Sequence, residues 1–130
     1  MSEGSDVISV MLPPDERYVH LLRLTVSGIG LRMDLTYDDV EDLKLAVNEA
    51  FLLSVGHTSK ERIAVDFLVD EAAAEVRFNS VGDLASHADS DDHESLGLFL
   101  IKGVMDQVHF ENVAGENSLR MVKKLARESV

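Results

Sequence analysis

Hydrophobic positions along this chain recur at two different periods, and their order predicts the secondary structure. Apolar residues at helical spacing predict helices over residues 15–33, 36–55 and 96–105. Short apolar runs and strict alternation of apolar with polar residues predict strands instead. These strands cover residues 7–11, 62–69, 75–78, 108–112 and 118–124.

Turn formers and capping residues set the boundaries of these elements. The proline pair at 13–14 ends the first strand, and Asp15 and Thr36 are placed to cap the two helices that follow. Gly56 is expected to stop the second helix. The stretch 81–94 is polar and predicts a mobile loop.

In chain order, the elements are strand, helix, helix, strand, strand, helix, strand and strand. Such an order places the helices on one side of a largely antiparallel sheet, which is an α+β fold built as a two-layer sandwich. We expect one domain over residues 7–125, with a flexible N-terminus at 1–6 and a C-terminal tail at 126–130. The length of 130 residues suits a single hydrophobic core.

The balance of charge restricts the classes of partner. The chain carries 24 acidic and 12 basic residues, so its net charge is -12, which disfavours direct contact with nucleic acid or an anionic membrane and favours basic proteins. It has no cysteine, and its five histidines lack the close spacing of zinc-binding helices, so we expect no metal site of that kind. The polar N-terminus and the lack of a long apolar run predict a cytoplasmic protein.

Glu49 is distinguished by its position on the second predicted helix. Its neighbours three and four residues away are all apolar, namely Leu45, Ala46, Leu52 and Leu53. A carboxylate on such a face either is desolvated or is held by a partner from another element, and both are common at functional sites. The alternative is an acid at the rim of the buried stripe that extends to water. The spacing alone leaves both interpretations open.

Several stretches of the chain resemble one known family. They are residues 18–19 (YV), 22–28 (LRLTVSG), 36–50 (TYDDVEDLKLAVNEA), 96–101 (LGLFLI) and 105–108 (MDQV). Together they are similar to the anti-sigma-factor serine kinases of the Bergerat, or GHKL, ATPase superfamily. The likeness keeps its order over most of the chain, from residue 7 to residue 125.

This resemblance implies the Bergerat fold, the histidine kinase-like ATPase architecture, with three helices on one face of a mixed, mostly antiparallel sheet. Proteins of the family bind a sigma factor and switch it off. They also use ATP and magnesium to phosphorylate a serine on a small anti-anti-sigma antagonist, a STAS-domain protein. The implied partners are a sigma factor, an anti-anti-sigma factor and a second copy of the chain in a homodimer, in bacterial stress or sporulation.

Carried over residue by residue, the resemblance gives Glu49 the place of the family's glutamate, which resembles a general base for the attacking hydroxyl. Four residues later the family has an asparagine that binds magnesium, and this chain has Leu53, which offers no oxygen to a hard cation. At the aspartate that binds the adenine amino group stands Ser80, while the glycine of that motif is present as Gly82. Asp83 is a substitute for the aspartate only in a shifted register.

The family's third motif supplies two glycines whose amides wrap phosphate at a helix N-terminus. Gly97 keeps one of them, and Ser95 replaces the other and is expected to cap the helix. Ser118 replaces a threonine beside the adenine position, and the lid before the third helix is shortened. Departures at the metal, adenine and phosphate contacts together predict that nucleotide binding is lost or weakened, so we expect no cofactor.

Three functions remain open from the residues. The first is an anti-sigma-like binding protein without kinase activity. The second is an active serine kinase that uses ATP and magnesium, with Glu49 as base and Asp89 or Asp91 of the polar loop helping to hold the metal. The third is a pocket retuned for another small ligand. For the first, the resemblance puts the partner-binding residues on the first helix and just before it: Arg17, Tyr18, His20, Leu21, Arg23 and Leu24.

Overall fold

A computed structural model describes residues 6–87 and 93–125 of the protein. Within these residues the chain forms five strands, three α-helices and two short 3-10 helices. They are β1 (Asp6–Leu12), η1 (Glu16–Tyr18), α1 (Val19–Met33), α2 (Tyr37–His57), β2 (Ile63–Val69), β3 (Ala73–Phe78), η2 (Leu84–His87), α3 (His93–Val104), β4 (Gln107–Val113) and β5 (Glu116–Lys124). The predicted order of strands and helices is confirmed.

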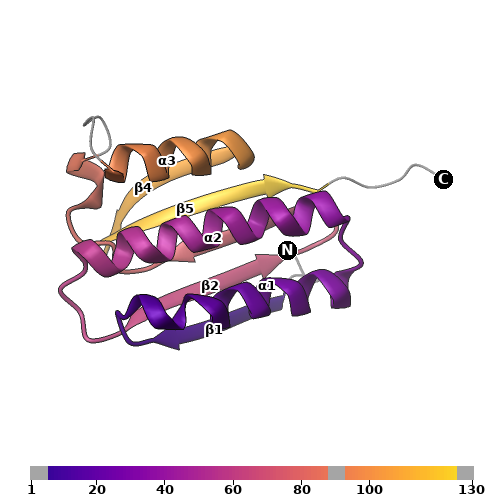
Figure 1. Cartoon of the computed structure of the whole chain (residues 1–130), viewed down its shortest axis with the longest axis horizontal. Coiled ribbons are helices and arrows are strands. Elements are labelled where there is room, and N and C mark those ends of the chain that lie inside the picture. Colours follow the sequence, from indigo (N-terminus) through magenta and orange to yellow (C-terminus); the bar gives the residue numbers. More distant parts are fainter. Residues whose placement is uncertain (1–5, 88–92, 126–130) are drawn as a thin grey trace.

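The five strands form one sheet in the order β1-β2-β3-β5-β4, and every neighbouring pair is antiparallel. All three α-helices lie against the same face of this sheet, with α2 in the middle, α1 on one side of it and α3 on the other (Figure 1). The predicted α+β two-layer sandwich is therefore confirmed, but the sheet implied by the resemblance as mixed is antiparallel throughout the described residues. Its strand β1 forms one edge of the sheet and β4 the other.

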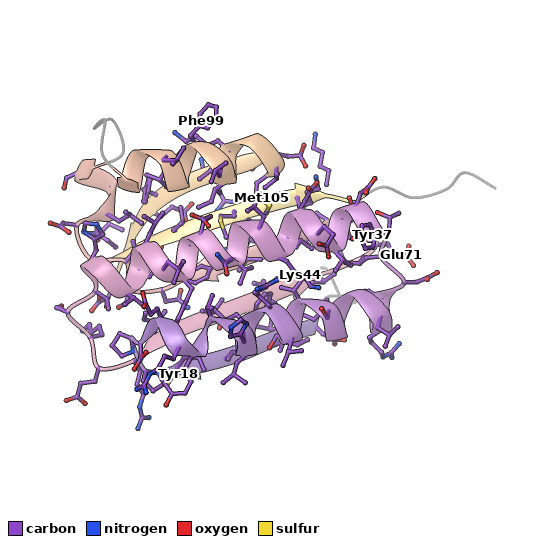
Figure 2. All side chains as sticks on the ribbon, viewed as in Figure 1. Tyr18, Tyr37, Lys44, Glu71, Phe99 and Met105 are labelled. Atoms are coloured by element: carbon purple, nitrogen blue, oxygen red, sulfur yellow. The ribbon has the colours of Figure 1, made fainter. Side chains whose placement is uncertain are left out.

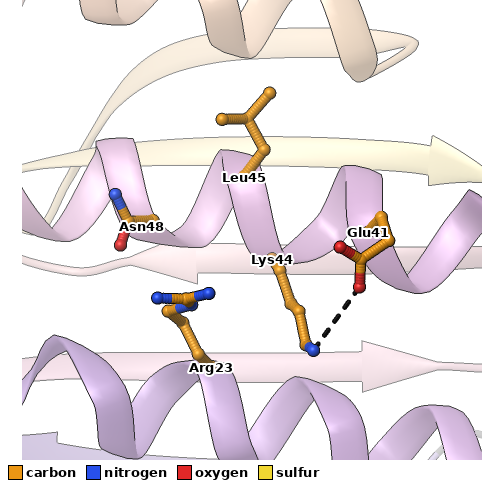
Figure 3. A pocket seen from close by; sticks show the side chains of 5 residues that line it. All are labelled: Arg23, Glu41, Lys44, Leu45 and Asn48. Carbon is orange, nitrogen blue, oxygen red and sulfur yellow. Dashed lines mark ion pairs between the residues drawn. The ribbon is translucent and has the colours of Figure 1, made fainter.

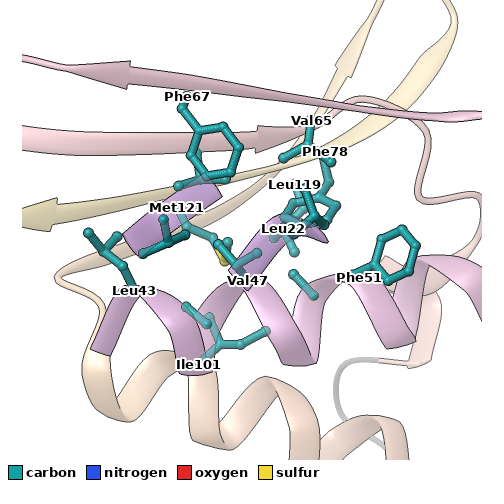
Figure 4. Close-up of a cluster of buried hydrophobic side chains, with 14 of the residues drawn as sticks. Leu22, Leu43, Val47, Phe51, Val65, Phe67, Phe78, Ile101, Leu119 and Met121 are labelled. Carbon is teal, nitrogen blue, oxygen red and sulfur yellow. The ribbon is translucent and has the colours of Figure 1, made fainter. Parts of the chain in front are cut away.

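The core lies between α2 and the helix-facing side of the sheet (Figure 4). The alternation in β2 puts Ile63, Val65 and Phe67 on that side, and all three are buried. From α2, Val47 and Phe51 are completely inaccessible to solvent. Full burial of side chains of this size stabilises the fold by about 1.5–3 kcal/mol each.

Of the boundaries predicted at Asp15, Thr36 and Gly56, the one at Thr36 is correct, the one at Asp15 begins the short helix η1 and not α1, and the one at Gly56 is wrong. The Asp15 carboxylate accepts a hydrogen bond from the Arg17 amide at the start of η1, and the Thr36 hydroxyl accepts one from the Asp39 amide at the start of α2. Gly56, by contrast, does not stop α2. The helix continues to His57 because the backbone turns to an extended conformation only at the next residue.

The polar stretch 81–94 is more structured than the predicted loop. It contains η2, where Leu84 is fully buried and anchors the turn to the core, and α3 begins at His93. Asp89 and Asp91 lie outside the described residues, as do residues 1–5 and 126–130, while Asp6 already belongs to β1. Within the described ranges, no helix combines the length and the apolar character that crossing a membrane requires.

Lys123 on β5 connects three elements. Its ammonium group donates hydrogen bonds to the Asp42 carboxylate of α2 (Nζ–Oδ2 2.8 Å) and to the Val104 carbonyl at the end of α3 (3.0 Å). Burial of the amine opposes its charge, but the hydrogen bond and charge of Asp42, with the charges of Asp39 and Asp106, outweigh burial and raise the pKa of Lys123. The protonated lysine therefore stabilises the folded state.

We expect Lys123→Met to lower the free energy of unfolding by about 1–3 kcal/mol at neutral pH, because the Asp42 carboxylate then loses its partner. This contribution is complete below the unfolded lysine pKa of about 10.4 and is lost as the pH rises through the higher folded value. Urea titrations from neutral to alkaline pH measure it, with Lys124→Met at the exposed neighbouring position as the control. A stability difference that stays constant into the alkaline range would contradict this role.

Candidate functional site

Three positions of the nucleotide-site motifs meet where α2 packs against α3. Gly97 of α3 faces Glu49 and Leu53 of α2 so closely that a Cβ added to it would lie 3.2 Å from Leu53 Cδ1 and 3.4 Å from Glu49 Oε1. A side chain at this position would require Leu53 to shift by a few tenths of an ångström, so glycine favours the close approach of the two helices. Gly97, Glu49 and Leu53 therefore form one cluster. From the sequence, this proximity is implied only by the resemblance to the family.

Glu49 lies at the edge of the buried face of α2. Ala46 is fully buried and Leu53 is 9% exposed, but Leu52, on the other side of Glu49, is 37% exposed. The carboxylate itself is partly buried, and its Oε2 accepts a hydrogen bond from the Asn48 side-chain amide at 3.2 Å. The geometry agrees with an acid at the rim of the apolar stripe, within reach of the α2–α3 contact.

The residues of this cluster do not fit a magnesium ion. Magnesium takes oxygen ligands in near-octahedral geometry. The methyl groups of Leu53 occupy the position one turn after Glu49, which leaves the Glu49 carboxylate and the Asn48 amide as the nearby polar groups on α2. In the described part of the chain, no group of three or more histidine, aspartate or glutamate side chains is arranged to hold a metal.

The predicted phosphate cradle also differs from the expectation. We expected Ser95 to cap the third helix and Gly97 to follow at its N-terminus, but α3 begins at His93, so Ser95 is its third residue and Gly97 its fifth. The prediction of a Ser95 cap is wrong. Only the first four amides of a helix lack a partner in the preceding turn. The amide of Gly97 is therefore used inside the helix, because α3 starts earlier than the motif implies.

At the end of β3, Ser80 takes part in a polar network. It is buried, and its hydroxyl donates to Glu116 Oε2 at 3.3 Å, while Glu116 Oε1 pairs with the ammonium group of Lys60 at 2.6 Å. The hydrogen bond from Lys60 is the main cause that lowers the pKa of Glu116. Ser80 thus links β3 to the start of β5 through its own hydroxyl.

Gly82 holds the chain after β3 against the end of α2. Its φ of +58° is in the left-handed region, and a Cβ at this position would overlap the carbonyl oxygen of His57. Its own carbonyl accepts a hydrogen bond from the Asn117 side chain at 2.8 Å. The following residue, Asp83, pairs with the His57 imidazole (Nδ1–Oδ1 2.6 Å). Both residues therefore fasten this loop to α2.

Ser118 is buried on β5, opposite β4. Its hydroxyl donates to the Glu111 carbonyl at 3.4 Å, across the pair of strands. Sequence reasoning missed four residues that hold this region together: His57, Lys60, Glu116 and Asn117. A signal existed for His57, which follows Glu49 by eight residues and Leu53 by four on the same helix, whereas the other three act through contacts distant in sequence.

With this geometry established, comparisons with known proteins identify the family. The histidine kinase-like ATPase domain family matches residues 12–123. The chain belongs to this family. The family assignment made from the sequence motifs, with its Bergerat fold, is therefore confirmed.

Several named proteins of this family are similar to the whole chain. The serine-protein kinase RsbW of Bacillus subtilis (strain 168) is 35% identical over 100% of this chain and 92% of its own length. The serine-protein kinase RsbW of Staphylococcus aureus (strain bovine RF122 / ET3-1) is 33% identical over 100% of this chain and 94% of its own. Both relatives are named serine-protein kinases, which agrees with the resemblance to anti-sigma-factor serine kinases.

A solved structure shares the fold. The crystal structure of the RsbU and RsbW domains of Rv1364c from Mycobacterium tuberculosis matches with a TM-score of 0.66 and 13% identity. The match covers 95% of this chain and 34% of that longer chain. At this level of identity, the likeness establishes the histidine kinase-like ATPase fold alone.

We expect Gly82→Ala to destabilise the protein by more than about 3 kcal/mol, because the new Cβ adds a clash with the His57 carbonyl to the cost of a left-handed backbone. Gly115→Ala is the matched control. That glycine also has a positive φ, of +85°, but a Cβ there meets open space, so only the backbone cost of about 1–2 kcal/mol applies. Equal midpoints of urea unfolding for the two variants would show that the Gly82 loop does not pack on α2.

Proposed function

We propose that this chain is an anti-sigma-like regulator of transcription that binds a sigma factor, an anti-anti-sigma factor of the STAS class, or both, with nucleotide binding weakened or lost. Membership of the histidine kinase-like ATPase family and similarity to the RsbW kinases support the regulatory part. The loss of nucleotide binding rests on one contact, that of Leu53 with Gly97 beside Glu49, which puts apolar carbon where the family has a magnesium ligand. Under this proposal the protein acts in the cytoplasm.

The proposed partner-binding residues lie at the start of α1 and in η1, on the side of the molecule away from α3 (Figure 2). Leu24 is 67% and Leu21 47% exposed, so both leucines are accessible to a partner. Arg17 is exposed as well, but its guanidinium group already pairs with the Asp15 carboxylate at 2.7 Å. The leucines and Arg23 are therefore the stronger candidates for contacts with a partner.

An active serine kinase is the second candidate function, with ATP and magnesium as cofactors. Two observations favour it: the RsbW relatives are named serine-protein kinases, and Glu49 retains the position of the base next to the α2–α3 contact. A carboxylate can act as a general base only within hydrogen-bond reach of the hydroxyl that it activates. Under this alternative, water and phosphate oxygens replace the missing protein ligand of the metal.

Calorimetry with ATP and magnesium separates the two functions. We expect no measurable heat at millimolar nucleotide, because the metal position is apolar and the Gly97 amide is occupied within α3. Circular dichroism of the same sample confirms that the protein is folded. Micromolar binding that disappears with a chelator or in Glu49→Ala would overturn the proposed loss of nucleotide binding and favour the kinase.

The edge strand β1 supports a homodimer, the third partner proposed from the family. From residue 7 to residue 12 it carries no charged side chain, in a chain whose net charge is -12. Val7 and Met11 on this strand are exposed, and an edge strand has unpaired backbone groups along its length. A second copy of the same strand can pair with it without bringing like charges together.

We expect light scattering to give the mass of a dimer for the natural protein and that of a monomer for Met11→Glu, because the new carboxylates repel each other across the paired strands. Val113→Glu is the matched control. Met11 is 61% and Val113 57% exposed, and the two lie on opposite edges of the sheet. A dimer that survives Met11→Glu but dissociates in Val113→Glu would place the interface at β4 instead.

A further inference from the structure

The charge of α1 is opposite to that of the chain as a whole. Its 15 residues include Arg23 and Arg32 but no aspartate or glutamate, whereas the complete chain has a net charge of -12. The overall charge alone favours basic partners. Since screening limits surface interactions to about 8 Å at physiological salt, the local charge on α1 decides what this face attracts.

Between α1 and α2 the surface is hollowed into a groove, which we call the α1–α2 groove. At its closed end the helices touch, and a Cβ at Gly30 would lie 2.5 Å from Val40 Cγ2. Further along, two adjoining pockets of about 270 and 370 Å³ open between them and share Arg23 and Lys44 in their walls. His20 and Leu24 line one pocket, and Glu41 and Asn48 line the other.

The two cations of the groove come from different helices and approach the same space. Arg23 extends from α1 toward α2, and Lys44 extends from α2 toward α1 (Figure 3). Lys44 reaches Glu41, with Nζ and Oε2 3.4 Å apart, so one cation is partly compensated within the chain. Because Arg23 and Lys44 face one carboxylate, the groove keeps an excess of positive charge.

The rim of the groove is apolar on the α1 side. Leu24 lines the larger pocket and is among the most exposed leucines of the described chain. An exposed leucine beside the cations Arg23 and Lys44 matches a partner helix that carries carboxylates on one stripe and apolar side chains on the next. A nucleic acid fits poorly, because its regularly spaced phosphates would be repelled by a protein with a net charge of -12.

We propose that the α1–α2 groove binds an acidic amphipathic helix of a partner protein, with Lys44 and Arg23 pairing with its carboxylates and the exposed Leu24 of α1 covering its apolar side. This inference rests on the proposed function, whose partner-binding face it extends from α1 to α2. Lys44 becomes a specificity-determining residue, since it adds a second cation to the groove, where Arg23 is the arginine that α1 provides. Glu41 competes with the carboxylates of the partner helix for the ammonium group of Lys44.

The experiment measures binding of two probes to the full chain by fluorescence polarisation. One probe set comprises the purified sigma factors and anti-anti-sigma factors of the host, and the other is a labelled synthetic helix with glutamates on one stripe and leucines beside it. We expect Lys44→Glu to weaken binding about tenfold or more, and Glu41→Gln to tighten it about two- to fivefold, because Lys44 is then released. Lys102→Glu, the same charge change at an exposed position of α3, is the control.

The outcomes separate this inference from the proposed function. If host factors bind the natural protein and Lys44→Glu behaves like Lys102→Glu, the groove is wrong and the regulator remains. If no host factor binds, the proposed function fails, and the synthetic helix alone tests the groove. Equal affinity for that helix and for a version with lysines in place of its glutamates overturns the inference. The tighter binding of Glu41→Gln distinguishes a direct role from partial unfolding, which can only weaken binding.

Discussion

The helix α2 packs against the sheet through side chains that are completely buried, and the other elements are placed with respect to it. Val47 and Phe51 reach into the core from its sheet-facing side. Its two flanks then contact α1 and α3, since both helices lie on the same face of the sheet (Figure 1). Because α2 is held on three sides, it cannot shift without opening the core. Its side chains that do not face the sheet therefore keep a fixed orientation.

This constraint explains the state of the candidate nucleotide site. Leu53 lies on the flank of α2 that meets α3, where its methyl groups rest against Gly97. The same contact that seals the helices together therefore excludes an oxygen ligand one turn from Glu49. One turn after Leu53, at the C-terminal end of α2, Gly82 and Asp83 fasten the loop after β3 to His57. Packing and hydrogen bonds internal to the protein thus involve positions that the sequence resemblance assigns to nucleotide binding.

The opposite flank of α2 shows how a chain can combine an acidic surface with a cationic groove. All carboxylate side chains of the protein lie outside α1, and α2 contributes Lys44 to the wall of the groove. Net charge governs solubility and long-range repulsion between copies of the protein. Recognition at short range depends on the few side chains that face one groove. The net charge of the protein and the local charge of the groove can therefore have opposite signs.

Periodicity and family motifs determined the order of the strands and helices, the inward face of β2 and the position of Glu49 on α2, because these depend on residues that are close in sequence. They did not determine where α3 begins, because Ser95 resembles a capping residue in the sequence although it is the third residue of the helix. They also predicted a loop in the polar stretch 81–94, because the burial of Leu84 in the core depends on contacts with other elements. Only the tertiary structure brought Leu53 to Gly97, Ser80 to Glu116 and Arg23 to Lys44. Each of these contacts joins residues of different elements, whose distance is set by packing and not by spacing along the chain.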